Sequence, residues 1–443
     1  MENQKTFAEK FQEWTSTSIS LKLGIIAFLI ILLLIPKSLV DDLIYERQQR
    51  QNEAEIEVTD KWSREQLVMG HYLSVPYIIE HKTEYEGKVS IEKEKKTIYL
   101  FPETLKINGE LEGESLHRGI FDVVVYKADL SIHSTLNFDG IGRLNIDSSK
   151  VLWDQAKLHL SVSDLRGIGK NPSIKINGFL HTAEPFYDNH NDLSGLEVKL
   201  NSIKENTPLE VETIMMLKGS KELNFVPLGK TSEVELSGKW QDPSFDGNFL
   251  PDYREVNDKG FKGIWEILHF NRGFGQEFTS TMPNVHQSTF GLELRMAVDQ
   301  YQQSTRSSKY GILIILLSFL SLFLMETITK RRIHPLQYIL IGLALILYYT
   351  LLISISEHTG FNVAYIIASA ITIVLLGFYT HTMFKELKKS LVFTGILSVF
   401  YAFIFVITKE QDYALLIGSV GMFIALAATM FATKRIAWYK KEQ

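Results

Sequence analysis

Residues 23–40, LGIIAFLIILLLIPKSLV, are the first of several apolar stretches that decide the fold of this 443-residue chain. A helix needs about 20 mostly apolar residues to cross a bilayer, and this stretch comes close to that length. Lys37 lies near one end, where a long side chain carries its charge to the interface. The following residues, PKSLVDDLIYERQQR, contain no small-x-small cleavage pattern, so the sequence predicts an uncleaved signal anchor.

The C-terminal part of the chain contains further apolar stretches of membrane-spanning length. Basic clusters follow alternate apolar stretches: KRR at 330–332, KELKK at 385–389 and KRIAWYKK at 434–441. The connections SEHTG and KEQD follow the other stretches and therefore lie on the opposite side of the membrane. Basic short loops face the cytoplasm. We therefore expect both termini in the cytoplasm and residues 41–309 across the membrane. The five expected spans are 310–328, 336–355, 361–380, 391–408 and 413–433.

The segment between the first and second spans changes from helical to strand character. Residues 41–67 are rich in Glu, Gln, Arg and Ala and lack Gly and Pro, which predicts a helical stalk. Beyond them, short stretches alternate apolar with polar residues, which is typical of strands. Gly219 and Ser220 predict a hairpin turn between two of them. The expected strands are 97–101, 105–111, 121–126, 128–137, 173–181, 209–217, 222–228 and 232–240.

These patterns together predict an α+β membrane protein with six transmembrane helices and a large β-rich, sandwich-like extracytoplasmic domain between helix 1 and helix 2. The expected parts are a cytoplasmic tail with the signal-anchor helix, residues 1–40; a stalk and β-rich domain, residues 41–309; a five-helix bundle, residues 310–433; and a cytoplasmic tail, residues 434–443.

The composition excludes several classes of protein. A net charge of −5 and an isoelectric point near 6.2 give no basic field for nucleic acid. The absence of cysteine excludes disulfides, thiolate metal sites and cysteine nucleophiles. No G-x-S-x-G, H-E-x-x-H or P-loop motif is present, so we expect no enzyme activity, no cofactor and no metal. DNHND at 188–192 lacks the glycine and the downstream glutamate of a calcium loop, which favours a solvated loop over a cation site.

Three longer stretches carry a resemblance to a known family. They are SVSDLRGIG at 161–169, DPSFDGNFLPDYREVNDKGFKGIW at 242–265 and VDQYQQSTRSSKYGILII at 298–315, the last followed by ETITKRRIHPLQYILIGLALILYY. In this order they resemble the CreD family of inner-membrane, cell-envelope-integrity proteins over nearly the full length. The resemblance implies a bacterial inner-membrane protein with a large periplasmic insertion and a role in envelope integrity under stress. It brings no catalytic residues with it.

Polar residues in these motifs are candidates for binding or docking. On a strand, Asp164 and Arg166 share a face and can form an ion pair, although a structural role at a strand end explains them as well as a contact with a partner or lipid headgroup does. Asp246, Asp252, Arg254 and Glu255 occupy a stretch rich in turn residues, where recognition loops are common, although a solvated structural loop is the alternative.

Glu357 and His358 lie in SEHTG, between two expected spans. A connection of about five residues is the length expected for a helical hairpin. We expect Gly360 to end or reverse a helix and Glu357 to complement the positive end of the next one. Histidine is the side chain suited to switching charge near neutral pH, which leaves a pH-sensitive contact at His358 open beside the structural interpretation as a turn and docking corner.

The leading functional hypothesis is a non-enzymatic inner-membrane protein whose periplasmic β domain senses, scaffolds or binds a component of the envelope. Its expected partners are membrane lipids and an envelope protein, lipid or glycan ligand, with the oligomeric state left open. The alternative is a lipid- or small-molecule-handling protein of transporter type. A membrane enzyme that uses Glu357 and His358 is a third hypothesis without a motif to support it.

Overall fold

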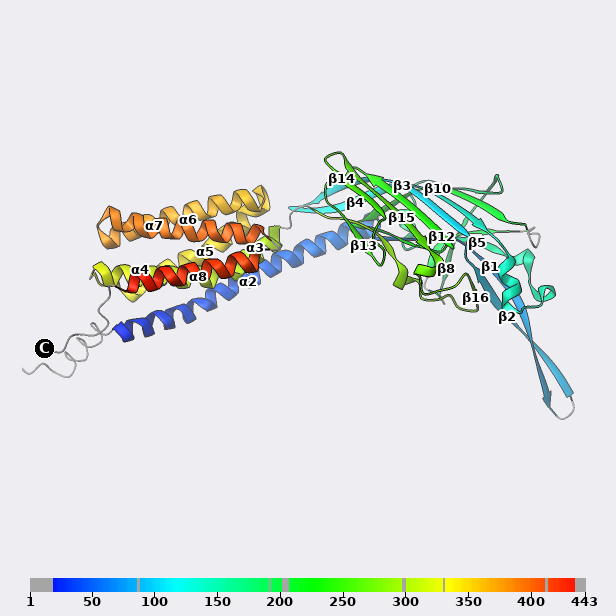
Figure 1. Cartoon of the computed structure of the whole chain (residues 1–443), viewed down its shortest axis with the longest axis horizontal. Coiled ribbons are helices and arrows are strands. Elements are labelled where there is room, and N and C mark those ends of the chain that lie inside the picture. Colours follow the sequence, from blue (N-terminus) through cyan, green and yellow to red (C-terminus); the bar gives the residue numbers. More distant parts are fainter. Residues whose placement is uncertain are drawn as a thin grey trace, which may run out of the picture. The chain divides into compact units, whose positions relative to one another are not determined.

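The computed structural model describes residues 19–85, 88–189, 191, 193–200, 207–296, 300–329, 331–410 and 413–434. The chain forms two compact units. One consists of residues 52–297, and the other combines the chain before and after that segment. Figure 1 follows the chain through both units, with the strands in the first and α4 to α8 in the second.

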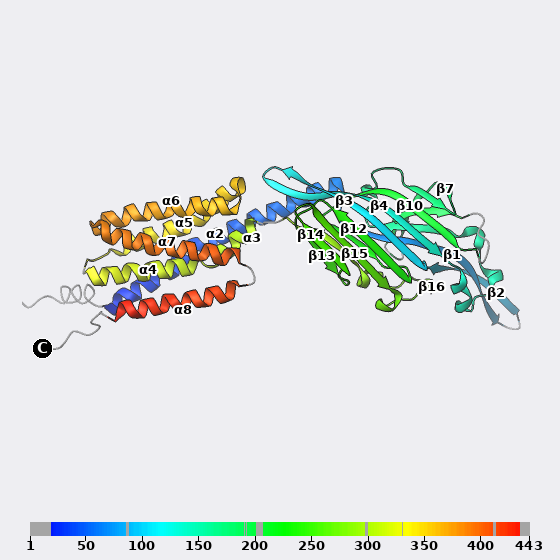
Figure 2. The same cartoon turned by 45° about the horizontal axis from the view of Figure 1, so that its top comes forward.

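The helical unit contains the expected membrane-spanning segments. Among the described residues, six helical segments are long and apolar enough to cross a membrane, α3 and α4 counting as one of them, which confirms the predicted number. Figure 2 shows α4 to α8 running side by side. The helices are α2 (Ile19–Trp62), α3 (Gln300–Lys309), α4 (Gly311–Thr329), α5 (Pro335–Thr359), α6 (Phe361–Phe384), α7 (Leu387–Lys409) and α8 (Ala414–Thr433).

Two of these helices differ from an ordinary apolar span. The predicted span at 23–40 and the predicted stalk are one helix, α2, which continues to Trp62. The short α3, QYQQSTRSSK, is polar, yet it buries Tyr301, Ser304, Ser307 and Ser308. Its buried face is therefore made largely of hydroxyl groups rather than of hydrocarbon.

Charged side chains between the helices are paired. Lys37 of α2 is buried, and its Nζ lies 2.6 Å from Asp41 Oδ2, while Ser308 Oγ of α3 donates to Asp41 Oδ1 at 2.5 Å. Glu326 of α4 lies 2.7 Å from Lys22 Nζ. These pairs offset the cost of placing charges between membrane-spanning helices.

The other unit is a β domain built from two sheets, as predicted. Within the described residues, sheet A has nine strands: β1 (Gln66–Tyr85), β2 (Lys88–Leu100), β5 (Lys157–Val162), β8 (Glu184–Asp188), β9 (Leu193–Lys199), β11 (Glu222–Val226), β13 (Pro243–Gly247), β16 (Glu277–Thr279) and β17 (Phe290–Leu294). Sheet B has eight: β3 (Thr104–Arg118), β4 (Phe121–Leu136), β6 (Ser173–Ile176), β7 (Phe179–His181), β10 (Leu209–Ser220), β12 (Thr231–Gly238), β14 (Tyr253–Asn257) and β15 (Gly260–Leu268).

The strand order of each sheet joins segments that are far apart in sequence. Sheet A runs β13-β17-β11-β1-β5-β9-β8, with β2 also paired to β1 and β16 paired to β2, and sheet B runs β14-β15-β12-β3-β4-β10-β6-β7. The pairs β1–β11 and β3–β12 are parallel, whereas the other ladders are antiparallel. Aromatic rings fill part of the core between the sheets, where Trp265 of sheet B lies 5.6 Å from Phe290 of sheet A between ring centroids.

The hairpin of β1 and β2 extends beyond the core. The backbone of β1 pairs with β5 from Val68 to Ser74, and beyond an isolated bridge at Tyr77 its described partner is β2. The last five residues of β1, 81–85, are exposed, and Figure 1 shows this hairpin projecting from the neighbouring strands.

Two connections between elements differ from the sequence interpretation. The strands on either side of Lys221 do not form a hairpin: β10 belongs to sheet B and β11 to sheet A. Lys221 adopts a left-handed backbone with φ of 54°, and the chain crosses from one sheet to the other there. The second concerns SEHTG, because α5 continues to Thr359 and α6 begins at Phe361, which leaves Gly360 as the connection.

Candidate functional site

A cleft of about 820 Å³ lies on sheet A, and we call it the sheet A cleft. Strands β1, β2, β5, β8 and β9 supply most of its lining. On β1 the lining residues Tyr72, Ser74 and Pro76 alternate with Leu73 and Val75, which point into the core. The period of two in a strand therefore gives this sheet one apolar face and one face suited to a ligand.

His159 of β5 is the central polar group of the cleft. Its ring is stacked on Tyr72, with centroids 4.9 Å apart, and meets Phe186 edge-on at 4.7 Å. Its Nε2 lies 2.7 Å from Ser74 Oγ, and Nδ1 is buried and has no hydrogen-bond partner among the described residues. Burial lowers the pKa of His159 to about 3, so the imidazole is neutral at physiological pH.

The charged side chains of the cleft balance one another. Three lysines, Lys95, Lys157 and Lys199, and three acids, Asp154, Asp188 and Glu197, line it. Lys157 Nζ lies 2.8 Å from Glu197 Oε1, and Lys95 Nζ donates to Gln155 Oε1 at 2.6 Å. The cleft thus offers donors, acceptors and aromatic faces without a dominant charge.

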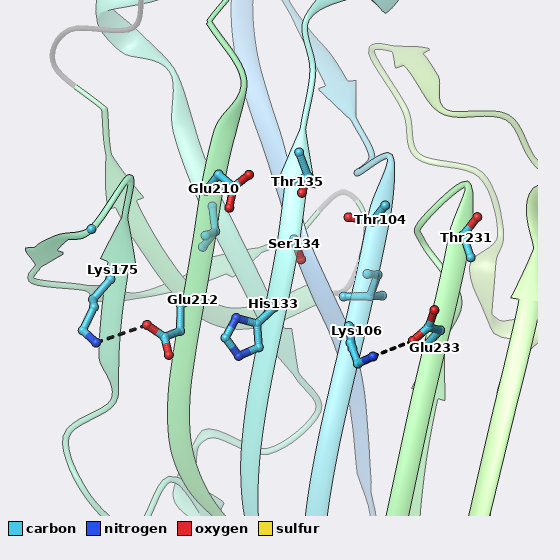
Figure 3. A pocket seen from close by; sticks show the side chains of 13 residues that line it. Thr104, Lys106, His133, Ser134, Thr135, Lys175, Glu210, Glu212, Thr231 and Glu233 are labelled. Atoms are coloured by element: carbon cyan, nitrogen blue, oxygen red, sulfur yellow. Dashed lines mark hydrogen bonds and ion pairs between the residues drawn. The ribbon is translucent and has the colours of Figure 1, made fainter.

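A second concave region, on the outer face of sheet B, is smaller and differs in character (Figure 3). It has a volume of about 460 Å³. The strand register aligns Lys175, Glu212, His133, Lys106 and Glu233 in one row across five strands. Lys106 pairs with Glu233 at 2.8 Å and Lys175 with Glu212 at 3.1 Å, so the carboxylates and ammonium groups of this row bind each other (Figure 3). Exposed pairs of this kind stabilise a solvated sheet face and leave few unpaired charged groups to bind a ligand.

The Ser74–His159 pair has the separation of a nucleophile and its base, but no acid among the described residues contacts the other nitrogen of the imidazole. A catalytic histidine is usually oriented by an acid on its other nitrogen, whereas His159 Nδ1 has no partner among the described residues. A base with a pKa of about 3 accepts a proton poorly at neutral pH. Among the described residues there is also no group of three His, Cys, Asp or Glu side chains placed to hold a metal ion.

The predicted pair Asp164 and Arg166 joins the end of α2 to the β domain. It lies in a short 3-10 turn (Leu165–Gly167) rather than on a strand, so the predicted strand geometry is wrong. Arg166 Nη2 lies 2.9 Å from Asp164 Oδ2, and Arg166 Nη1 donates to the carbonyl of Asp60. Asp164 also accepts hydrogen bonds from Ser63 Oγ and the amide of Arg64.

Electrostatics favour the ionised form of Asp164. Burial raises the pKa of this carboxyl, but hydrogen bonds from the Arg166 side chain and from the backbone amides of Arg64 and Arg166 outweigh burial and hold the pKa at about 2. Gly167 makes this packing possible, because a Cβ there would overlap Gln66 and the carbonyl of Lys218. The geometry of this pair is that of a structural junction.

The four polar residues of the second motif do not form one pocket. Asp246 lies on β13 at an edge of sheet A, whereas Arg254 and Glu255 lie on β14 at an edge of sheet B. All are exposed, and Asp252 accepts a hydrogen bond from the amide of Glu266 at 2.8 Å. The expected turn-rich loop is thus shortened by two edge strands, and none of the four residues lines the sheet A cleft.

Glu357 and His358 separate in the structure. Glu357 lies in the last turn of α5, not at the start of the next helix, so the predicted dipole interaction is wrong. Its side chain is largely buried; Tyr301 Oη donates to Oε1 at 3.0 Å, and Arg47 Nε lies 3.7 Å from that oxygen. His358 is exposed. The structure therefore places the acid in a helix-packing contact and the imidazole in solvent.

The DNHND stretch borders the sheet A cleft. Asp188 and Asn189 line it, and Asn191 Nδ2 donates to Asp188 Oδ2 at 2.8 Å and to Tyr99 Oη at 3.3 Å. His190 and Asp192 lie outside the described residues.

The main residues of the cleft were missed from the sequence. Tyr72 and Ser74 lie on β1, and Lys157 and His159 on β5, and neither strand was predicted. Their signal is the alternation of aromatic or polar with aliphatic residues in HYLSV at 71–75 and KLHLS at 157–161. The two stretches come together because β1 pairs with β5, and local sequence patterns do not indicate which strands pair.

Comparisons with known proteins cover nearly the whole chain. The family model for CreD, described as "Inner membrane protein CreD", matches residues 18–439. The inner membrane protein CreD of Escherichia coli strain K12 is 33% identical over 416 residues, which cover 93% of this chain and 91% of that protein.

Proposed function

Because this chain belongs to the CreD family of inner membrane proteins, we propose that it supports the integrity of the cell envelope by binding an envelope component through its β domain, without catalysis. The observation that carries the proposal is the sheet A cleft, where Tyr72 and His159 lie among balanced charges in a space of about 820 Å³. That volume lies within the usual range of ligand pockets, about 300–1,000 Å³.

The proposal includes an orientation in the membrane. Arg331 and Arg332 precede α5, Lys385 lies between α6 and α7, and Lys388 and Lys389 lie in the first turn of α7, whereas the connection between α5 and α6 is Gly360. Basic short loops stay in the cytoplasm. This puts both termini in the cytoplasm and the β domain in the periplasm, where it meets envelope components.

Binding is favoured over chemistry by the state of the polar groups. The imidazole of His159 is neutral and buried, and Lys157 and Glu197 neutralise each other. Such groups orient a ligand through hydrogen bonds without supplying a strong base or nucleophile.

The lining favours a ligand that is polar but uncharged. Aromatic rings at Tyr99, Phe186 and Tyr187 offer flat apolar faces, and the neighbouring amide, ammonium and carboxylate groups offer hydrogen bonds. Equal numbers of lysines and acids give no net attraction to an anion or a cation. A glycan combines hydroxyl groups with apolar ring faces, and we propose it as the ligand class.

The test uses the full chain in lipid nanodiscs and N-acetylglucosamine oligosaccharides as the probe, with saturation-transfer NMR as the readout. We expect transfer to the sugar ring protons. We also expect Tyr187→Ala, which removes a ring that is 64% exposed, and Glu197→Gln to reduce the transfer several-fold. Lys106→Met is the matched control, because it breaks an ion pair of the same 2.8 Å length on sheet B. Equal transfer in all variants, or none in the parent protein, would refute the proposal.

A further inference from the structure

Another cavity of the β domain, of about 400 Å³, is formed by loops rather than by strands, and we call it the loop pocket. Its lining residues lie at 248–249, between β13 and β14, at 271–274, between β15 and β16, and at 283–288, between β16 and β17. Asn248 Nδ2 donates to the carbonyl of Gln287 at 2.7 Å, which ties two of these loops together. Loops held on a rigid sheet are common places for binding.

The loop pocket differs from the sheet A cleft in its charge. Among the described residues that line it, none is acidic and Arg272 is the one charged residue. The other polar side chains of the lining are three asparagines, a glutamine and a serine. The pocket therefore carries a positive charge that its own walls do not balance, whereas the sheet A cleft is lined by as many acids as lysines.

Arg272 is buried without an anionic partner. Its Nη groups donate to four backbone carbonyls and to the amide oxygen of Gln276, all of which are neutral. Its guanidinium carbon lies 4.1 Å from the ring centroid of Phe274. Within the described parts of the chain, Nε has no hydrogen-bond partner and no carboxylate forms an ion pair with Arg272. Burial lowers the pKa of Arg272 to about 10, so an anion nearby would stabilise its charged form.

Two asparagines at the mouth of the pocket have nitrogens that are left to donate. Asn271 Oδ1 accepts a hydrogen bond from the amide of Leu268 at 3.1 Å, and Asn284 Oδ1 accepts one from the amide of His286 at 3.2 Å. Because the backbone uses the oxygen of each carboxamide, the Nδ2 group is the part that remains for a ligand. Donors grouped around a cation, with no acid among them, select an anion.

The arrangement of the donors favours one shape of anion. A planar carboxylate is bound best by the parallel N–H fork of arginine, but the Nη groups of Arg272 are already bonded to protein oxygens. The remaining donors, Asn271, Asn284 and the hydroxyl of Ser288, come from two separate loops. Donors that approach from different directions suit the oxygens of a tetrahedral anion.

We propose that the loop pocket binds a phosphate group, either as the free ion or as the ester of a small solute. Arg272 supplies the positive charge at the wall of the pocket, and the neutral amides and the serine hydroxyl at its rim supply the directional hydrogen bonds. Since one full charge acts alone, the affinity depends strongly on these neutral donors.

The experiment uses the full chain in dodecyl maltoside, an uncharged detergent without phosphate, and isothermal titration calorimetry in a phosphate-free buffer. The probes are inorganic phosphate, glycerol phosphate and, as a planar anion, acetate. We expect saturable binding at one site for the phosphate probes and much weaker binding of acetate. Tighter binding of glycerol phosphate would identify an esterified ligand, and tighter binding of inorganic phosphate would identify the free ion.

Charge variants of equal size make the test specific to this pocket. Asn271→Asp and Asn284→Asp keep the oxygen that accepts from the backbone but replace the donor with a negative oxygen, so each should weaken phosphate binding by more than about tenfold. Asn177→Asp is the matched control, because Asn177 Oδ1 also accepts from a backbone amide, that of Glu210 at 2.8 Å, and lies outside the pocket. It should leave the affinity unchanged.

Gln287→Lys tests the proposal by a gain of binding. Gln287 is exposed and lines the pocket, so a second cation there should tighten phosphate binding several-fold at an equal melting temperature. No saturable binding of either phosphate probe by the parent protein would overturn the proposal. So would acetate binding as tight as that of phosphate, or an equal change in Asn177→Asp and the pocket variants. None of these results bears on the sheet A cleft, because the two sites share no residue.

Discussion

Lys22 Nζ of α2 lies 2.7 Å from Glu326 Oε1 of α4, so an ion pair joins two membrane-spanning helices that are 304 residues apart in sequence. Glu326 also accepts hydrogen bonds from Tyr338 Oη and the amide of Ile333, each at 3.2 Å. The glutamate side chain is 6% exposed and the lysine side chain 30%. The contact therefore belongs to the interior of the bundle rather than to its surface.

Removal of one member of this pair is expected to destabilise the bundle. Lys22→Met leaves the buried carboxylate of Glu326 without its cation, at a cost of about 3 kcal/mol in the free energy of unfolding. Glu326→Gln retains hydrogen bonding and costs less. A double-mutant cycle in detergent, followed by thermal unfolding, measures the coupling, and additive effects of the two substitutions would contradict the expected interaction.

Asp164→Asn is expected to loosen the junction between α2 and the β domain. The amide cannot accept the charge-assisted bonds from Arg166, and the loss is about 1–3 kcal/mol of local stability. Hydrogen exchange at the amides of Arg64 and Arg166 should become faster, because both bond to this carboxylate. Glu110→Gln, on an exposed position of β3, is the control and should leave these amides unchanged.

Two buried imidazoles predict a specific pH dependence of β-domain stability. His71 lies between Ser134 Oγ and Thr213 Oγ1, each at 2.8 Å, and burial lowers its pKa to about 3, as for His159. In the unfolded chain these imidazoles bind protons with a pKa near 6.5. The free energy of unfolding is therefore highest above pH 6.5 and falls as the pH drops toward 3. Each ring contributes a loss of about 2 kcal/mol between pH 6.5 and roughly pH 5, where carboxylates remain mostly ionised.

The measurement is the unfolding midpoint of the β domain in the full chain between pH 8 and roughly pH 5. In His71→Gln the unfolding midpoint at pH 8 should be lower than in the parent protein. As the pH falls through this window, the midpoint should drop about half as steeply as in the parent protein. An unchanged slope would mean that His71 is not the source of the dependence.

Gly360→Ala is expected to strain the turn between α5 and α6. Gly360 has φ of 75° and ψ of 159°, a region open essentially to glycine, and the cost is roughly 1–3 kcal/mol. A Cβ at this position meets no atom within 4 Å, so the effect is conformational rather than steric. His358→Ala, two residues away and exposed, should change the melting temperature little, and equal effects of both substitutions would contradict this account.

The sequence predicted the elements whose signal is local. Apolar length identified the spans, and a period of two identified strands such as β3, β4 and β12, because one face of each strand is buried and the other is solvated. The pattern at 121–137 was divided into two strands, but it forms the single strand β4. The crossing at Lys221 was missed, because a Gly-Ser turn signal does not tell whether the next strand joins the same sheet.

The candidate site was less predictable than the fold. Conspicuous charged motifs such as Asp164 and Arg166 turned out to hold the chain together, whereas the sheet A cleft is made of common residues that the sheet brings side by side. His159 illustrates the reason. Its neighbours Ser74, Tyr72 and Phe186 come from strands β1 and β8, and their contact depends on strand order, which no local pattern encodes.

The parallel pairing of β1 with β11 has a consequence for the order in which the domain forms. Gln66 lies opposite Leu223, and Thr104 of β3 lies opposite Thr231 of β12. Strands near the start of the domain therefore pair with strands that are synthesised much later. Chains dominated by such distant pairings fold slowly and expose strand edges in the meantime. Until β17 (Phe290–Leu294) has been synthesised, the first half of the domain therefore remains an unfinished sheet with unpaired strand edges.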